Sequence, residues 1–120
     1  MMMSKYHAQR WNGYDSKREA KRAAELKAMV TAGEISDLRE QVPFELIPAQ
    51  YEVVMRTGKR GQALKPKRRC LERACSYIAD FVYNKNGEQV VEDAKGVHTP
   101  DYIIKRKLML DKFGIRIQEV

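Results

Sequence analysis

Apolar residues recur at helical spacing in two parts of the chain. Residues 17–32 are rich in Ala, Leu, Lys and Glu, which favour helices, and Ser16 and Gly33 suit the N-cap and the position just past the end. Residues 100–113 have a similar pattern. The sequence therefore predicts two helices, one near each end of the chain.

The second predicted helix has a complete set of end signals. Thr99 can serve as its N-cap, Pro100 occupies the first helical position, and Gly114 follows the last apolar residue. Residues 115–120 then alternate apolar and polar side chains, as a short strand does. A strand that directly follows a helix suits a crossover connection back into the same sheet.

Between the two helices the pattern is typical of strands. The stretches PFELI (43–47) and YEVVM (51–55) are strand candidates of alternating character. Residues 76–83 and 88–95 flank Asn86–Gly87, the strongest hairpin signal in the chain, and are predicted to pair antiparallel. We therefore expect an α/β or α+β domain with one mixed sheet.

Length and charge narrow the class of protein. With 120 residues, 43% of them hydrophobic, the chain can form one domain with a real core but not two. We expect that domain over residues 15–120, after a flexible N-terminal arm over residues 1–14 that shows no apolar period. The formal net charge of +7 favours a polyanionic partner such as nucleic acid.

The cysteines and histidines do not suggest a zinc site. Cys70 and Cys75 are five residues apart, and His7 and His98 lie far from both in sequence. Two free thiols fit a reducing compartment, and no apolar stretch is long enough for a signal peptide or a membrane span. These features predict a cytoplasmic protein without a membrane partner.

Acidic residues mark a candidate site on the predicted hairpin. Asp93 and Lys95 share one face of the second hairpin strand, because side chains alternate along a strand. On the first hairpin strand Ile78, Asp80 and Val82 share a face that otherwise reads as core. Acids on neighbouring strands raise one another's pKa unless a cation lies between them. Hard oxygen ligands would favour Mg²⁺ or Mn²⁺.

The first helix supplies a third acid. Glu19 shares a helical stripe with Ala23, Leu26 and Val30, and a carboxylate on a stripe that faces the sheet is costly unless it has a partner. A different interpretation is a capping box, in which the Glu19 side chain folds back onto the backbone amide of the N-cap residue Ser16 and contacts no metal.

In this order the acidic residues resemble the motifs of the PD-(D/E)XK nuclease superfamily: a helical Glu, Asp80 on a hairpin strand, and Asp-Ala-Lys on the next strand. The stretches YDSKREAKRAAELKAMVTAGEISDLREQVPFELIP, YIADFVY and VVEDAKG are similar to a phage and prophage family of unknown function, near archaeal-type Holliday junction resolvases and transposase-like endonucleases. The likeness extends from Tyr14 to Val120 and implies a restriction-endonuclease-like core. One departure is Ala79, where the superfamily has proline.

The resemblance implies a role for each motif residue. Asp80 and Asp93 would ligate a Mg²⁺ or Mn²⁺ ion together with the carbonyl of Ala94. Glu19 would bind a metal ion or its water. Lys95 would orient or activate the attacking water and stabilise charge on the phosphate. Hydrolysis would be metal-assisted and in line.

Basic residues outside the motifs would contact the nucleic acid. Residues 56–73 hold eight basic residues and one acid around two glycines and a proline, a composition that predicts a loop or a disordered basic flap. A solvated loop without a partner is the alternative. One of two lysines on the second helix is expected to face the phosphate, and Gln41 is a candidate to support the metal ligands. The candidate nucleic-acid contacts are Lys59, Arg60, Lys65, Lys67, Arg68, Arg69, Lys105 and Lys107.

Simpler interpretations remain open for the hairpin residues. Asp93 and Lys95 could form an exposed ion pair worth less than ~1 kcal/mol. Glu92 is expected to be solvated or on the opposite face, unless a bulge shifts the register and brings it to the metal site.

Three functions follow from these features. The first is a metal-dependent DNA endonuclease that acts on branched or Holliday junction DNA during phage recombination or DNA processing, as a homodimer because paired nicks need two sites. The second is a non-catalytic DNA-binding accessory protein on the same fold. The third is a basic RNA- or protein-binding phage factor, which predicts that Asp80 and Asp93 are exposed and far apart.

Overall fold

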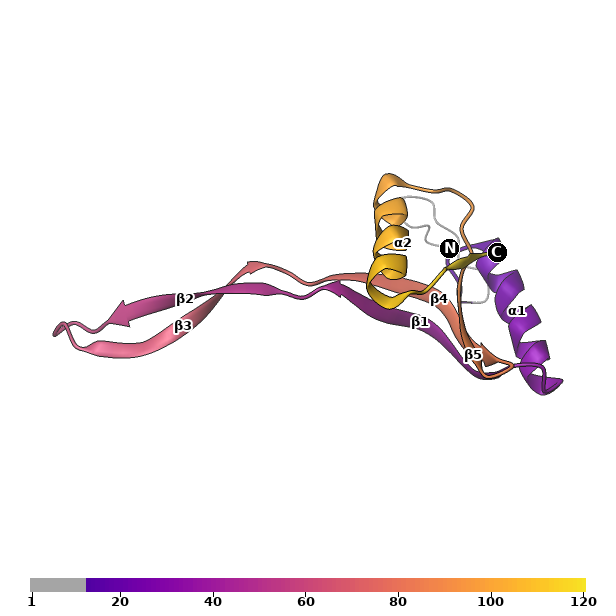
Figure 1. The fold of residues 1–120 in the computed structure, drawn as a ribbon, viewed down its shortest axis with the longest axis horizontal. Coiled ribbons are helices and arrows are strands. Elements are labelled where there is room, and N and C mark those ends of the chain that lie inside the picture. The colour runs from indigo at the N-terminus through magenta and orange to yellow at the C-terminus, as the bar shows by residue number, and fades with distance from the viewer. Residues whose placement is uncertain (1–12) are drawn as a thin grey trace, which may run out of the picture.

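Two helices enclose a four-stranded sheet, and a two-stranded arm extends away from them (Figure 1). The computed structural model describes residues 13–120. Its dimensions of 70 × 44 × 28 Å reflect the length of the arm. The elements run in the order α1 (Lys17–Thr31), β1 (Ser36–Ile47), β2 (Gln50–Thr57), β3 (Ala63–Glu72), β4 (Cys75–Lys85), β5 (Glu88–Asp93), α2 (Pro100–Phe113) and β6 (Gln118–Glu119).

The main sheet has the order β1-β4-β5-β6. β1 pairs antiparallel with β4, and β4 with β5, whereas the short β6 runs parallel to β5. Helix α2 makes the crossover between these two parallel strands. The predicted mixed α+β arrangement and the crossover to the last strand are therefore confirmed for this sheet.

The helix ends follow the local signals in the sequence. The Ser16 hydroxyl caps α1 by accepting a hydrogen bond of 3.0 Å from the Glu19 amide. The Thr99 hydroxyl caps α2 by accepting from the Tyr102 amide at 3.3 Å. Gly114 ends α2 in the left-handed region, with φ of 67°. Local side chains thus determine where both helices begin.

The hairpin between β4 and β5 also forms as predicted. Asn86 and Gly87 have φ values of 52° and 78°, and the turn is closed by the pair Lys85 and Glu88. Positive φ at both central residues is the requirement of a type I′ turn, which Asn-Gly satisfies.

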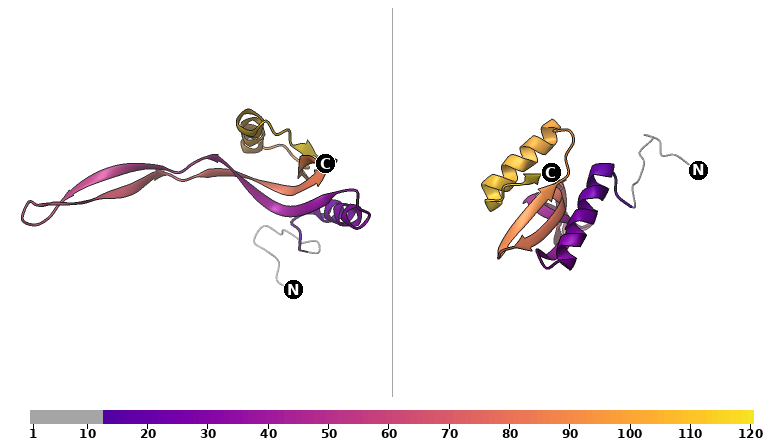
Figure 2. Two further views of the ribbon diagram at one scale, coloured as in Figure 1. Left: turned by 60° about the horizontal axis from the view of Figure 1, so that its bottom comes forward. Right: turned by 90° about the vertical axis from the view of Figure 1, so that its right-hand side faces the viewer.

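The core has two parts, one on each face of the sheet (Figure 2). Tyr102 and Met109 of α2 pack on one face, against Val91 of β5. Ala23 and Leu26 of α1 pack on the other face. Neighbouring residues of β5 therefore point toward different helices, as the alternation of side chains requires.

Strand β4 breaks this alternation at Asp80. Ala79 and Val82 both belong to the core beneath α2, whereas Phe81 faces α1. Opposite Asp80 on β1 lies Gln41, whose φ of 53° is unusual for a residue other than glycine. The alternation of β4 thus breaks beside a residue of β1 with an unusual backbone conformation.

One expectation about β4 was therefore wrong. Ile78 is 55% exposed and Val82 is fully buried, so the predicted apolar face shared by Ile78, Asp80 and Val82 does not exist. The prediction assumed an unbroken period of two, which β4 does not keep between Ala79 and Val82.

The basic run 56–73 is not a loop. It forms the end of β2, the turn and all of β3. The two strands pair into a separate two-stranded sheet, so the expectation of a single sheet was also wrong. A proline disfavours a strand interior, but Pro66 lies at a register shift, between the pairs Val54–Lys67 and Arg56–Leu64. Proline is tolerated at such irregular positions on edge strands.

Most of the predicted N-terminal arm, residues 1–14, lies outside the described residues. Within them, Tyr14 packs against the core beneath α1, and its hydroxyl accepts a hydrogen bond of 3.0 Å from Lys27. Neither helix in the described part of the chain has the length and apolar character that a membrane crossing requires.

Candidate active site

Glu19 is buried in the first turn of α1. One of its carboxylate oxygens accepts a hydrogen bond of 3.1 Å from the Asp15 amide, just before the helix. The other accepts one of 3.0 Å from the Gln41 side chain. Glu19 thus folds back toward the helix start, much as a capping box would have it, and still faces the sheet with its second oxygen.

Gln41 connects this glutamate to β4. Its amide nitrogen donates to Glu19 at 3.0 Å and to Asp80 at 3.3 Å, so the two carboxylates share one donor. Gln41 lies opposite Asp80 in the pairing of β1 with β4, and its backbone is in the left-handed region. Backbone strain of this kind, which costs on the order of 1–3 kcal/mol, is concentrated at functional sites in proteins.

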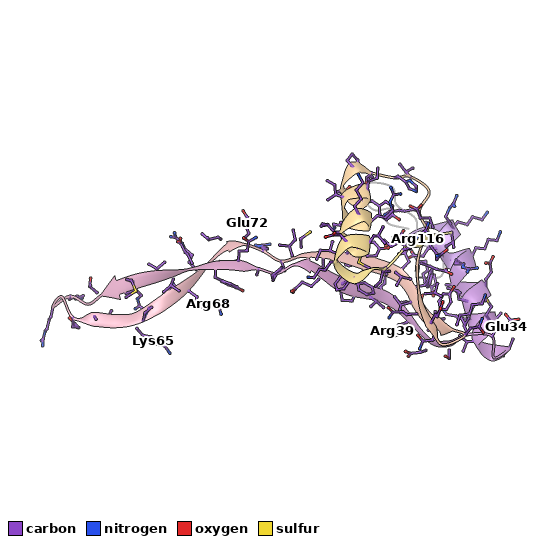
Figure 3. All side chains as sticks on the ribbon, in the orientation of Figure 1. Glu34, Arg39, Lys65, Arg68, Glu72 and Arg116 are labelled. Carbon is purple, nitrogen blue, oxygen red and sulfur yellow. The ribbon has the colours of Figure 1, made fainter. Side chains whose placement is uncertain are left out.

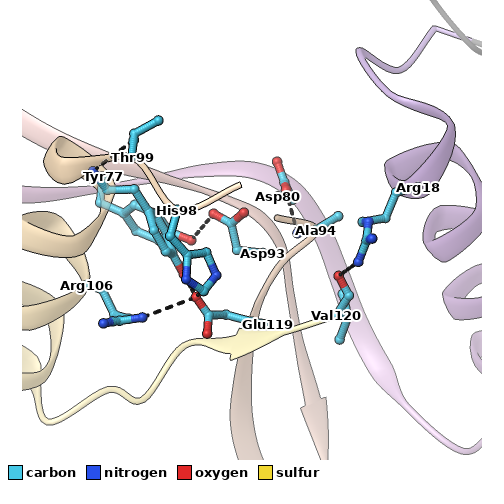
Figure 4. A network of polar contacts seen from close by, with 11 residues as sticks. Arg18, Tyr77, Asp80, Asp93, Ala94, His98, Thr99, Arg106, Glu119 and Val120 are labelled. Atoms are coloured by element: carbon cyan, nitrogen blue, oxygen red, sulfur yellow. Dashed lines mark hydrogen bonds and ion pairs between the residues drawn. The ribbon is translucent and has the colours of Figure 1, made fainter. Parts of the chain in front are cut away.

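Asp80 also contacts the end of β5. Its second oxygen accepts a hydrogen bond of 2.9 Å from the Ala94 amide (Figure 4). The pairing of Phe81 with Glu92, continued by one residue, places Asp93 opposite Asp80. The motif residues of β4 and β5 therefore adjoin each other.

Asp93 is buried on the α2 side of the sheet. Its side chain accepts a hydrogen bond of 2.6 Å from the Tyr77 hydroxyl (Figure 4). Its carbonyl accepts one of 3.0 Å from the Val120 amide, which continues the pairing of β5 with β6. The aspartate is thus held from two directions, in each case by a neutral donor.

The three acids are electrostatically linked. Burial, followed by the hydrogen bond and the charge of Asp80, raises the pKa of Glu19 from 4.5 to about 7. Burial also raises the pKa of Asp93, and the charge of Asp80 adds to this effect, whereas the Tyr77 hydrogen bond and Lys95 oppose it. Asp80 thus interacts with both other carboxylates, so the cluster has an excess of buried negative charge.

Two of the three acids, those on β4 and β5, open into a cleft of about 210 Å³ between β4 and the start of α2. Asp80 and Asp93 line it together with Lys95 and Lys105. The Lys95 ammonium lies 4.9 Å from the centre of the Tyr102 ring, a cation–π contact that places the amine beside Asp93. The Asp93–Lys95 pair is therefore part of a cleft and is not a fully exposed ion pair.

The residues present fit a hard divalent cation in their chemistry. Carboxylates from α1, β4 and β5 together with a backbone carbonyl are the oxygen ligands that Mg²⁺ and Mn²⁺ prefer. In residues 13–120, however, no three His, Cys, Asp or Glu side chains are already grouped closely enough to hold a metal ion. The Gln41 amide currently occupies the position between Glu19 and Asp80 where positive charge is needed.

A second buried acid lies on the other face of β5. Glu92 accepts two hydrogen bonds from the Arg22 guanidinium, of 2.8 and 2.6 Å, and a third from the Tyr83 hydroxyl. The expectation that Glu92 lies on the opposite face is confirmed, but it is not solvated. Its oxygens are fully engaged by Arg22 and Tyr83, so Glu92 is a structural residue of the α1 face.

Comparison with known proteins then identifies the family. The sequence profile of the family described as "Protein of unknown function (DUF1064)" matches residues 3–118. The chain belongs to this family. No curated protein and no solved structure matches it.

The two lysines predicted on α2 have different surroundings. Lys105 lines the cleft with Asp80 and Asp93, as expected for one of the pair. Lys107 lines a separate cleft with Arg106 and Arg116 and does not approach the acids.

The other candidate nucleic-acid residues lie on the arm, away from the acids (Figures 1 and 3). Lys59 and Arg60 are in the turn between β2 and β3, and the remaining four lie on β3: Lys65, Lys67, Arg68 and Arg69. The structure therefore separates the predicted basic contacts from the acidic cluster, except at Lys105.

Several residues of the site had no signal in the sequence. Tyr77 and Tyr102 read as ordinary core residues, although both line the cleft and contact Asp93 or Lys95. Arg22 resembled any exposed basic residue of α1. One signal was available. Because side chains alternate along a strand, Glu92 faces the opposite side from Asp93, and a buried carboxylate there needs a positive charge from α1.

Proposed function

We propose that this protein is a Mg²⁺- or Mn²⁺-dependent DNA endonuclease with a restriction-endonuclease-like core. Branched or junction DNA as substrate and a phage origin come from the family resemblance alone. A homodimeric state and a place in the cytoplasm complete the proposal. The observation that carries it is the position of Asp80, which shares the Gln41 donor with Glu19 and lines one cleft with Asp93 and Lys95.

The electrostatics of the cluster support a cation at this position. The raised pKa values of Glu19 and Asp93 mean that their ionised forms are disfavoured in the fold as it stands. Glu19, Asp80, Asp93 and the Ala94 carbonyl would hold the ion. A bound divalent ion supplies Lewis acidity toward the phosphate and relieves the repulsion among these carboxylates.

The chain's own residues would carry the remaining steps. Lys95 would hold the attacking water in line and stabilise charge on the phosphate, because its ammonium faces the same cleft as Asp93. Lys105 would bind a neighbouring phosphate oxygen from the opposite wall. Tyr77 would keep Asp93 in its orientation through the 2.6 Å hydrogen bond.

A non-catalytic DNA-binding protein is the second candidate. It is favoured by the Gln41 amide, which already satisfies both Glu19 and Asp80 with a neutral donor. The third function expected Asp80 and Asp93 to be exposed and distant, which the buried Asp93 and its interaction with Asp80 contradict.

Cleavage assays separate the two candidates. The purified protein is incubated with a four-way junction, a linear duplex and a single strand, each with Mg²⁺, Mn²⁺ or a chelator. Asp93→Asn and Lys95→Ala test the site. Matched controls are Asp111→Asn on the exposed side of α2 and Lys85→Ala at the end of β4, which remove the same groups elsewhere.

We expect metal-dependent cutting by the wild type and by both controls. Asp93→Asn and Lys95→Ala should cut about a hundredfold more slowly or worse, because the first removes a ligand of the metal ion and the second removes the group that orients and activates the attacking water. Binding without cutting under every metal condition would instead establish the non-catalytic function.

A further inference from the structure

The β2–β3 arm has no partner within the described chain. Its two strands pair with each other and with no other strand, and its side chains extend into solvent on both faces (Figures 1 and 3). Val53 is 65% exposed and Met55 is 75% exposed. An isolated hairpin is marginally stable in water, so an exposed apolar stripe along one indicates a surface that another molecule covers.

The charge of the arm indicates the chemistry of that molecule. Residues 50–72 contain seven Lys and Arg residues and two Glu, so they carry +5 of the chain's net +7. A second copy of the chain would bring the same positive charge to the arm, and the rest of the chain has no acidic excess to offer. A polyanion is therefore the complementary partner.

Basic side chains alternate between the two faces of the arm. Arg68 lies opposite Val53 on the face of the exposed apolar residues, and its guanidinium is 4.0 Å from the centre of the Tyr51 ring. Lys67 lies opposite Val54 on the other face. An element with cations on both faces suits a position between two rows of phosphates, with its apolar stripe toward the bases.

We propose that the β2–β3 arm is a β-ribbon that binds in the major groove of B-form duplex DNA. The eight residues of β2 span about 26 Å at ~3.3 Å per residue, most of one ~34 Å helical turn. The major groove of B-DNA, ~12 Å wide, admits a two-stranded ribbon, whereas that of A-form RNA is too narrow. Val53 and Met55 face the base edges, where thymine methyl groups offer apolar contact.

The arm also leads toward the carboxylates. It continues directly into β4, where Ser76, Ile78 and Asp80 follow one another at alternate positions and all line the acidic cleft. A duplex seated on the arm would therefore extend along this wall to the candidate active site. Only this last step rests on the proposed nuclease function; duplex binding by the arm does not.

Fluorescence anisotropy tests the arm in the presence of a chelator, so that binding is measured without cleavage. The probes are a labelled DNA duplex and an RNA duplex of the same sequence, titrated over a range of salt concentrations. The arm variant is Lys65→Gln with Lys67→Gln. The matched control is Lys85→Gln with Arg116→Gln, which removes two exposed positive charges from the body.

We expect the wild type to bind the DNA duplex more tightly than the RNA duplex. The arm variant should reduce the magnitude of the slope of log K against log salt by about 2, because each phosphate that is no longer neutralised reduces it by about 0.9. The control variant should leave the slope unchanged. Equal losses in both variants would show that net charge alone drives binding and would overturn the proposal. Equal affinity for the two duplexes would overturn it as well.

Two further measurements locate the groove. Val53→Ser with Met55→Ser should weaken DNA binding without changing the salt slope, because no charge is removed. Methylation of guanine N7, which projects into the major groove, should interfere with binding. Interference from adenine N3 methylation alone would place the arm in the minor groove and would contradict the proposal.

The two proposals can fail separately. A protein that binds duplex DNA through the arm but never cuts DNA with Mg²⁺ or Mn²⁺ would refute the nuclease and leave the ribbon. Metal-dependent cutting with an arm variant that binds like the wild type would refute the ribbon and leave the nuclease.

Discussion

Glu92 and Asp93 are neighbours on β5, both buried, yet their surroundings differ in kind. Glu92 points toward α1, where Arg22 supplies a paired positive charge through two hydrogen bonds. Asp93 points toward α2, where a tyrosine hydroxyl is its hydrogen-bond partner and the nearby Asp80 adds negative charge.

The difference separates an acid that the fold itself satisfies from one to which the proposed function assigns a role. A buried carboxylate with its own guanidinium is satisfied without any other molecule. A group of carboxylates held by neutral donors, with the pKa values of two of them raised, is stabilised when a cation binds. The α1 face of β5 is therefore satisfied within the fold, and the α2 face is where the proposed metal ion would bind.

Removing the cation from the structural acid should have the largest effect. Arg22→Met leaves Glu92 buried without its ion pair, which costs about 3–5 kcal/mol of unfolding free energy, measured by urea denaturation. Arg18→Met, on an exposed position of the same helix, should change it by less than about 0.5 kcal/mol. Equal losses in the two variants would mean that Glu92 does not depend on Arg22.

Adding a cation to the acidic cluster should have the next largest effect. Mn²⁺ at a hundred times its dissociation constant should stabilise the fold by about 2.7 kcal/mol, seen as a rise in melting temperature. Asp80→Asn should remove most of this rise, and Tyr83→Phe on the other face should keep it. A wild-type protein that Mn²⁺ does not stabilise would remove the distinction between the two faces.

The pH dependence of stability should show a smaller effect of the cluster. The pKa of Glu19 is raised from 4.5 to about 7, so the fold favours the protonated form. Its stabilising contribution is complete below pH 4.5 and is lost as pH rises to about 7, in a chelator. The unfolding free energy of the wild type should fall over this window relative to Glu19→Gln. Parallel profiles would contradict the burial of an ionisable Glu19.

The smallest effect concerns the neutral donor on the structural face. Tyr83→Phe removes the hydroxyl that donates to Glu92, and should cost about 1 kcal/mol of unfolding free energy by urea denaturation. Tyr51→Phe on the exposed arm is the matched control, with an expected change below about 0.5 kcal/mol. A cost of several kcal/mol for Tyr83→Phe would mean that the tyrosine, rather than Arg22, satisfies Glu92.

Much of the fold could be predicted because its signals are local. Ser16 and Thr99 cap the helices through hydrogen bonds to residues three positions ahead, and Asn86–Gly87 forms its turn by itself. The alternation along β5 likewise separates Glu92 from Asp93. These features depend on neighbours in sequence, so the sequence alone determined them.

Other features depend on partners far away in the chain. The basic run 56–73 forms strand β3 because β2 pairs with it. The strand propensities of its own residues do not indicate this pairing. The donor that Asp80 shares with Glu19 comes from Gln41, thirty-nine residues from Asp80. The positive charge that Glu92 needs comes from Arg22, seventy residues away.

The candidate site shows the same division. The sequence determined which acids and which lysine are present and placed the three acids on the right kind of element, whereas Lys95, predicted on the strand, lies just past the end of β5. The tertiary structure alone decided that Asp80 interacts with both Glu19 and Asp93, that Gln41 connects Glu19 to Asp80, and that the arm stands apart. Contacts between distant segments follow from packing and pairing, which the chain specifies only as a whole.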